Sequence, residues 1–105
     1  NGVTTTIEAL WKNVPVITKA GYNFNSRCGE SILKNANIQN FITTNNDDYI
    51  NKAVFYASNI DKLQDVRKKL FEQIEESPLF DTKSFSNEFC KALDNMLMQI
   101  NENYK

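Results

Sequence analysis

Two short β-rich stretches limit what this chain of 105 residues can fold into. Residues 14–18 read VPVIT and residues 41–43 read FIT, and each follows a segment with helical spacing. Uninterrupted apolarity is typical of strands buried on both faces of a sheet, and helix alternating with strand indicates an α/β fold with a parallel sheet. Two short strands rarely make a stable sheet alone, and no strand precedes the first helix. We therefore interpret the chain as part of a larger sheet.

The first half contains two expected helices. The first spans residues 4–12, follows a turn at Asn1 and Gly2, and carries its apolar side chains at i, i+3 and i+4. After a loop at residues 19–25, the second is expected to begin at Ser26 or Arg27 and to end near residue 34.

The second half is expected to be nearly all helical. Asn45 or Asn46 can cap a third helix and Asn59 a fourth, which Ser77-Pro78 ends because the residue before a proline resists helical geometry. Asp81 then caps a long last helix, whose apolar stripe consists of Phe85, Phe89, Ala92, Leu93, Met96 and Ile100.

Composition removes several classes of function. Twelve Lys and Arg against thirteen Asp and Glu leave a net charge of −1, so the chain has no basic field for nucleic acid. No apolar run approaches the roughly 20 residues that span a membrane, and no signal peptide opens the chain. Without histidine there is no Ser-His or Cys-His pair. Cys28 and Cys90 lack metal-ligand spacing and are expected to be reduced, partly buried thiols of a cytoplasmic protein.

The most informative stretch is residues 2–11, GVTTTIEALW. Gly2 allows an unusual backbone angle and the close approach of a ligand. Thr4 and Thr5 stand at a helix N-terminus, where free N–H groups and the helix dipole attract phosphate. Glu8 follows one turn after Thr4, so its carboxylate can accept hydrogen bonds from a ribose. The stretch therefore offers the groups that bind a nucleotide diphosphate.

A structural alternative explains the same residues. Thr5-x-x-Glu8 fits the capping box, in which side chains satisfy the N–H groups of the helix itself. Most such patterns are only caps, so the motif taken alone favours a cap.

Other charged groups offer less. Ser26-Arg27 can reach a phosphate or a carboxylate, but we favour a helix cap followed by a surface arginine. Asp47-Asp48 and Glu75-Glu76 are adjacent on helices and do not converge on one point, so they favour a solvated face.

The order of these features resembles the C-terminal end of glycosyltransferase family 41, which contains O-linked N-acetylglucosamine transferases and SPINDLY-type protein O-fucosyltransferases. The resemblance covers essentially the whole chain. The matching pieces are residues 1–5, 8–11, 14–18, Gly21, 26–27, 48–49, 63–67 and 77–81.

The resemblance implies a partial Rossmann-like C-terminal lobe of a GT-B glycosyltransferase, mostly helical with two short parallel strands. Residues 1–80 would belong to the nucleotide-sugar-binding lobe, and residues 81–105 would form a helix packing back on the rest of the enzyme. Thr4 and Thr5 would bind the donor diphosphate and Glu8 the ribose, without a metal or other cofactor. The full enzyme would transfer N-acetylglucosamine or a similar sugar to protein Ser or Thr hydroxyls.

Two positions depart from the animal enzymes of this family. Val3 replaces their histidine, and Glu8 replaces their aspartate, as in the SPINDLY type. The sugar, and the choice between a UDP-linked and a GDP-linked donor, therefore stay open. The family's leaving-group lysine, its acceptor groove and its tetratricopeptide repeats lie upstream, so no catalytic residue is assigned within this chain.

Two rival functions remain. The chain could be a non-catalytic helical interaction module, whose last helix docks in a partner's groove. It could also belong to another GT-B enzyme with a small-molecule acceptor, although the Ser77-Pro78-Leu79-Phe80 stop argues modestly against that.

Overall fold

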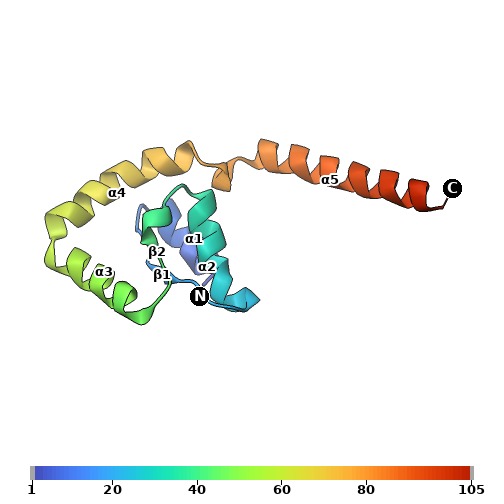
Figure 1. Cartoon of the computed structure of the whole chain (residues 1–105). Helices are drawn as coiled ribbons and strands as arrows, with labels where there is room; N and C mark the ends of the chain where they lie inside the picture. The colour runs from blue at the N-terminus through green and yellow to red at the C-terminus, as the bar shows by residue number, and fades with distance from the viewer. Residues whose placement is uncertain (1, 105) are drawn as a thin grey trace.

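The computed structural model of the chain describes residues 2–104, and these residues are mostly helical (Figure 1). Asn1, which was expected in the first turn, lies outside them. The elements in chain order are α1 (Thr4–Trp11), β1 (Thr18–Lys19), α2 (Phe24–Asn35), the 3-10 turn η1 (Gln39–Phe41), β2 (Ile42–Thr43), α3 (Asn46–Ser58), α4 (Ile60–Glu75), the 3-10 turn η2 (Pro78–Phe80) and α5 (Thr82–Asn103).

The sheet consists of β1 and β2 in parallel, with Thr18 opposite Ile42 and Lys19 opposite Thr43. The Thr43 hydroxyl donates to the carbonyl of Thr18 at 2.9 Å, and the Ala20 N–H donates to the carbonyl of Thr43 at 2.8 Å. The predicted pair of short parallel strands is therefore confirmed. The first strand was predicted at residues 14–18 but begins only at Thr18, because β2 offers partners to two residues and no other described strand reaches residues 14–17.

Helix starts follow the local capping residues. α2 begins at Phe24, earlier than predicted, because the Asn23 side chain accepts from the Ser26 N–H at 2.9 Å and the Ser26 hydroxyl accepts from the Asn23 N–H at 3.1 Å. Ser26 is thus the third residue of the helix, where it closes a capping box with Asn23, and not the first. At α3, the Asn45 side chain accepts from the Asp48 N–H at 2.8 Å, as one of the two predicted caps.

Asn59 precedes α4 as predicted, but its side chain does not cap that helix. Its amide instead donates to the carbonyl of Phe55 at 2.7 Å, one turn back in α3. Asn59 therefore helps to end the third helix, while the fourth starts without a side-chain cap.

A single hydrophobic core lies between the first two helices, the small sheet and α4. Leu10 of α1, Leu33 of α2 and Leu70 of α4 are fully shielded from solvent. The other buried apolar residues are Ile32, Ala36, Ile38, Phe41 and Ile74.

α5 extends away from this core, so the molecule measures 64 × 29 × 18 Å (Figure 1). The predicted stop is present: Ser77 precedes η2, and its hydroxyl donates to the carbonyl of Ile74 at 2.6 Å. The predicted cap is present too, since the Asp81 carboxylate accepts from the Ser84 N–H at 3.0 Å. α5 contacts η2 but buries none of its own residues.

Candidate functional site

The N-terminus of α1 carries no side-chain cap. Val3 occupies the N-cap position, where its apolar side chain cannot accept a hydrogen bond, and the first intrahelical bond runs from the Ile7 N–H to the carbonyl of Val3 at 3.1 Å. Thr4 and Thr5 are exposed. Because the first N–H groups of a helix have no acceptor within it, this helix start presents free donors to solvent.

The capping-box interpretation of Thr5 and Glu8 is wrong for this helix. A box needs the threonine at the N-cap, and Thr5 is instead the second residue of α1, after Val3 and Thr4. The carboxylate of Glu8 is exposed, and the ion pairs found among residues 2–104 do not involve it. Both side chains therefore remain available to a ligand.

The preceding turn is held close to the helix. The Thr6 hydroxyl donates to the carbonyl of Gly2 at 2.8 Å, and Thr6 is buried. A Cβ added to Gly2 would overlap the Thr5 hydroxyl, so a larger residue here would displace that side chain. No described glycine has a positive φ, so the unusual backbone angle that Gly2 allows is not used.

Two hollows surround the start of α2. One of about 500 Å³ is lined by Val3, Phe24 and Arg27 among others. The other, of about 710 Å³, lies beyond the carboxyl ends of β1 and β2 and is lined by Lys19 and again by Arg27. Ligands of α/β proteins bind at that edge of a sheet, so the residues at this edge belong to the candidate site.

Arg27 is a surface residue, as expected, and it lines both hollows. Its Nε donates to Glu30 at 3.2 Å, and Lys34 donates to the same carboxylate at 2.6 Å. The hydrogen bond from Lys34 is the main reason that the pKa of Glu30 lies below its ordinary value. Lys19 is exposed, and its ammonium donates to the Asn46 side chain at 2.7 Å. The only sequence signal for Arg27 was the Ser26-Arg27 pair.

Other kinds of site find less support among residues 2–104. No group of three or more His, Cys, Asp or Glu in that range could hold a metal ion, and no helix there is long and apolar enough to cross a membrane. Both cysteines are free thiols. Cys28 is partly buried as expected, but Cys90 is exposed, because it lies on α5, where the structure of residues 2–104 buries no residue.

A family model for glycosyl transferase family 41 matches residues 1–89. The chain belongs to glycosyl transferase family 41. Among relatives of this family 41 chain is a probable UDP-N-acetylglucosamine–peptide N-acetylglucosaminyltransferase SPINDLY of Solanum lycopersicum, 35% identical over 85 residues, which are 81% of this chain and 9% of that protein. The UDP-N-acetylglucosamine–peptide N-acetylglucosaminyltransferase of Caenorhabditis elegans is 27% identical over 105 residues, 100% of this chain and 9% of that protein.

A solved structure of a mutant Thermobaculum terrenum O-GlcNAc transferase superimposes on the family 41 chain with a TM-score of 0.81 and 30% identity. It covers 90% of this chain, which in turn covers 18% of it. The fold is therefore part of the Rossmann-like lobe of a GT-B glycosyltransferase, as the sequence predicted. The chain spans roughly a tenth of the length of the curated relatives it matches.

Proposed function

We propose that this chain holds the diphosphate and ribose of a nucleotide-sugar donor in a family 41 glycosyltransferase. The complete enzyme transfers a sugar, N-acetylglucosamine or a similar one, to Ser or Thr hydroxyls of a protein. The uncapped start of α1, with Thr4 and Thr5 exposed beside it, is the observation that carries the proposal. Two relatives named as UDP-N-acetylglucosamine–peptide N-acetylglucosaminyltransferases, one of them as a probable one, support it.

The chemistry of the helix start suits a diphosphate. Free N–H groups and the positive end of the helix dipole favour an anion, and the hydroxyls of Thr4 and Thr5 supply further donors. Val3, 47% exposed at the N-cap, offers an apolar contact where a histidine would have offered a hydrogen bond. Glu8 stands one turn further along α1, where its carboxylate accepts hydrogen bonds from the ribose hydroxyls.

The same groups serve the reaction. Negative charge accumulates on the nucleotide diphosphate as the sugar departs, and donors fixed in advance stabilise that charge without reorganising. In this proposal the helix start neutralises the charge that a divalent cation neutralises in metal-dependent enzymes, and the site uses no cofactor. No residue of this chain acts as acid or base. Those groups come from the rest of the catalytic region.

The remaining parts of the proposal concern the whole protein. Residues 1–80 belong to the donor-binding lobe, and residues 81–105 pack back on other parts of the enzyme, which covers the apolar stripe of α5. Tetratricopeptide repeats elsewhere in the protein select acceptors, and the enzyme works in the cytoplasm. The exposed face of α5 also favours a second candidate, a non-catalytic module that docks on a partner.

Thr5→Ala in the full-length enzyme tests the donor site. Losing one hydrogen bond to a charged phosphate costs about 1.5–3 kcal/mol of binding free energy. We therefore expect kcat/KM for the donor to fall roughly 10- to 100-fold. Thr82→Ala, at another exposed helix start, is the matched control and leaves transfer unchanged. Equal kinetics of Thr5→Ala and wild type would overturn the proposal.

An amide NMR titration of the same enzyme with UDP and GDP identifies the base. Shifts centred on residues 2–8 support a phosphate site at α1, and the nucleotide giving tighter binding names the donor class. A well-folded spectrum without shifts there for either nucleotide favours the interaction module.

A further inference from the structure

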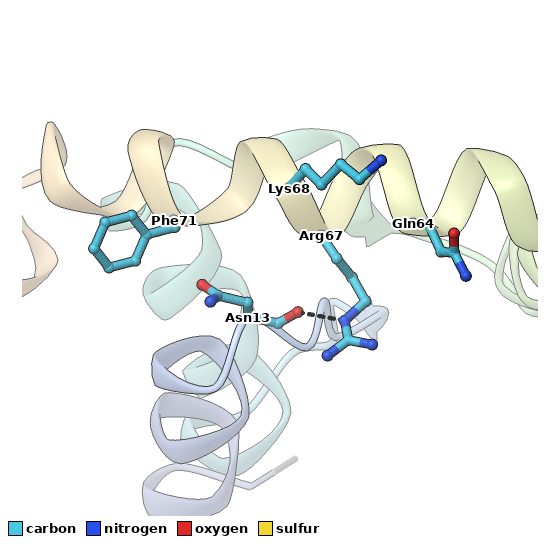
Figure 2. Close-up of a pocket in the computed structure, with 5 residues that line it drawn as sticks. All are labelled: Asn13, Gln64, Arg67, Lys68 and Phe71. Carbon is cyan, nitrogen blue, oxygen red and sulfur yellow. Dashed lines mark hydrogen bonds between the residues drawn. The ribbon is translucent and has the colours of Figure 1, made fainter.

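A groove runs between α4 and the C-terminal end of α1, at the opposite end of α1 from Thr4 and Thr5. It consists of two adjoining hollows of about 400 and 320 Å³, and Asn13 and Phe71 line both of them. Figure 2 shows the first hollow, with Asn13 in the turn after α1 and Phe71 on α4. The shared residues make the two hollows one continuous surface.

One half of the groove is apolar. Trp11 and Phe80 line it, with their ring centroids 5.1 Å apart in an edge-to-face arrangement. Trp11 is 65% exposed and Phe71 is 51% exposed. Clustered exposed aromatic side chains mark interaction sites far more often than scattered ones do.

The other half of the groove is basic. Arg67 and Lys68 line it, and each lies about one turn from Phe71 on α4. The two basic side chains leave the helix in different directions, and Arg67 points towards Asn13 (Figure 2). The Nε of Arg67 donates to the carbonyl of Asn13 at 2.9 Å (Figure 2). This bond fixes the position of the guanidinium beside the groove. It uses only the Nε, so the terminal N–H groups of Arg67 can donate to a ligand. The ion pairs among residues 2–104 involve neither Arg67 nor Lys68.

The groove also has a direction. Glu75 lines its apolar half, so the negative charge lies at the end opposite the two cations. An anionic ligand is attracted at the Arg67 end and repelled at the Glu75 end. The surface therefore distinguishes the two orientations of an amphipathic ligand.

We propose that this groove docks a peptide segment of a protein partner, in which a bulky apolar side chain is followed by acidic residues. The apolar side chain lies between Trp11 and Phe71, and the carboxylates pair with Arg67 and Lys68. Nucleic acid fits less well, since two cations beside an aromatic surface make no basic track and the chain's net charge is −1. The site is separate from the donor site and does not depend on it.

The test is a selection of random twelve-residue peptides displayed on phage against the full-length enzyme. The selected peptides are expected to place Asp or Glu within a few residues of Phe, Leu or Trp. A synthetic, fluorescently labelled copy is then titrated by anisotropy at low and high salt. Binding is expected to weaken several-fold in high salt, because the ion pairs are screened.

Two variants with exposed side chains locate the binding surface. Lys68→Glu is expected to lower the affinity for the labelled peptide about 10-fold, since it replaces an attraction with a repulsion. Phe71→Ala is expected to lower this affinity by a similar factor. Lys69→Glu makes the same charge change one residue along α4, outside the groove, and is expected to leave binding unchanged. Donor kinetics stay at the wild-type level in all three, which separates this test from that of Thr5.

The proposal is overturned by selected peptides without acidic residues, by equal loss of affinity in Lys68→Glu and Lys69→Glu, or by the absence of a selectable peptide. The last outcome means that the enzyme's own chain or a second copy covers the groove. Nucleic acid that competes with the labelled peptide at Lys68 also contradicts it.

Discussion

α4 and α5 are both long amphipathic helices, yet only one of them finds its partner within residues 2–104. α4 buries Leu70 completely and leaves Ile74 only 5% exposed, in the same core cluster as buried residues of α1 and α2. α5 buries none of its residues, and Leu93 in its stripe is 45% exposed. The two helices differ in what lies opposite them and not in their own pattern.

This contrast teaches what an apolar stripe on a helix can predict. The stripe shows that a face must be covered, because apolar surface left in water costs about 25 cal/mol per Å². It does not show whether the covering surface belongs to the same core. The exposed stripe of α5 therefore needs a surface beyond that core, which the proposed packing on the rest of the enzyme would supply.

Leu70→Ala and Leu93→Ala give the largest expected difference between the helices. Leu70→Ala removes a fully buried side chain and leaves a cavity, so it is expected to lower the free energy of unfolding by about 2–5 kcal/mol. Leu93→Ala, at a half-exposed position, is expected to cost less than about 1 kcal/mol in the 105-residue chain. Urea unfolding of both variants, followed by circular dichroism, measures the difference.

The same pair can break the comparison. If Leu93→Ala costs as much as Leu70→Ala, the stripe of α5 is already buried in solution, most simply against a second copy. Repeating the unfolding at several protein concentrations identifies that case, because the stability of an associated chain depends on concentration.

Much of the fold is predictable from local signals. Asn45, Ser77-Pro78 and Asp81 act where the sequence placed them, because capping and helix termination depend on a few neighbouring residues. The strand at residues 14–18 was predicted too long, since its apolarity shows burial while strand pairing depends on a distant partner. The start of α2 was missed because Asn23, and not Ser26, is the cap.

The site was predictable only in part. Thr4, Thr5 and Glu8 lie on the first helix as expected, but the sequence could not decide between a cap and a ligand site. That choice depends on where the helix begins, and Val3 at the N-cap decides it against a cap. The sequence predicted a surface position for Arg27. It could not predict that Arg27 lines two hollows, because that depends on tertiary packing. The roles of Val3, Thr4, Thr5 and Glu8 in binding the donor stay a prediction.

Gly29→Ala and Ala92→Leu sharpen the comparison with an intermediate effect. Gly29 is buried where α2 crosses β1, and an added Cβ would overlap the side chain of Thr18. Gly→Ala in an exposed helix stabilises by about 1 kcal/mol, but here overpacking is expected to destabilise by about 1–3 kcal/mol. Ala92→Leu adds a larger group to the exposed surface of α5 and is expected to change stability by less than about 0.5 kcal/mol.

Thermal unfolding of both variants gives the sign. A stabilising Gly29→Ala would mean that Thr18 moves aside and that the contact between α2 and β1 has room to adjust. A strongly destabilising Ala92→Leu would mean that α5 is closely covered in solution.

Asp81 gives the smallest expected effect, a pH-dependent fraying of α5 that leaves the core intact. Hydrogen bonds from Ser84, first from its N–H and then from its hydroxyl, hold the pKa of Asp81 below its ordinary value of 3.8. Because the pKa is lower in the folded helix, the cap contributes its full stability above the ordinary value. That contribution is lost as the pH falls through the lowered pKa.

Amide hydrogen exchange at Ser84 and Phe85, measured in acid, reports the fraying directly. Asp81→Asn keeps a side-chain acceptor that does not titrate, so protection in this variant is expected to change less between pH 5 and the acid limit of folding. Asp81→Ala is expected to lose protection at every pH. Among residues 2–104, α5 contacts η2 and buries none of its own residues, so neither variant should shift the unfolding of residues buried around Leu70. A parallel loss of protection at Leu70 would show that α5 and the core unfold as one unit, and the contrast between the two helices would then not extend to their stability.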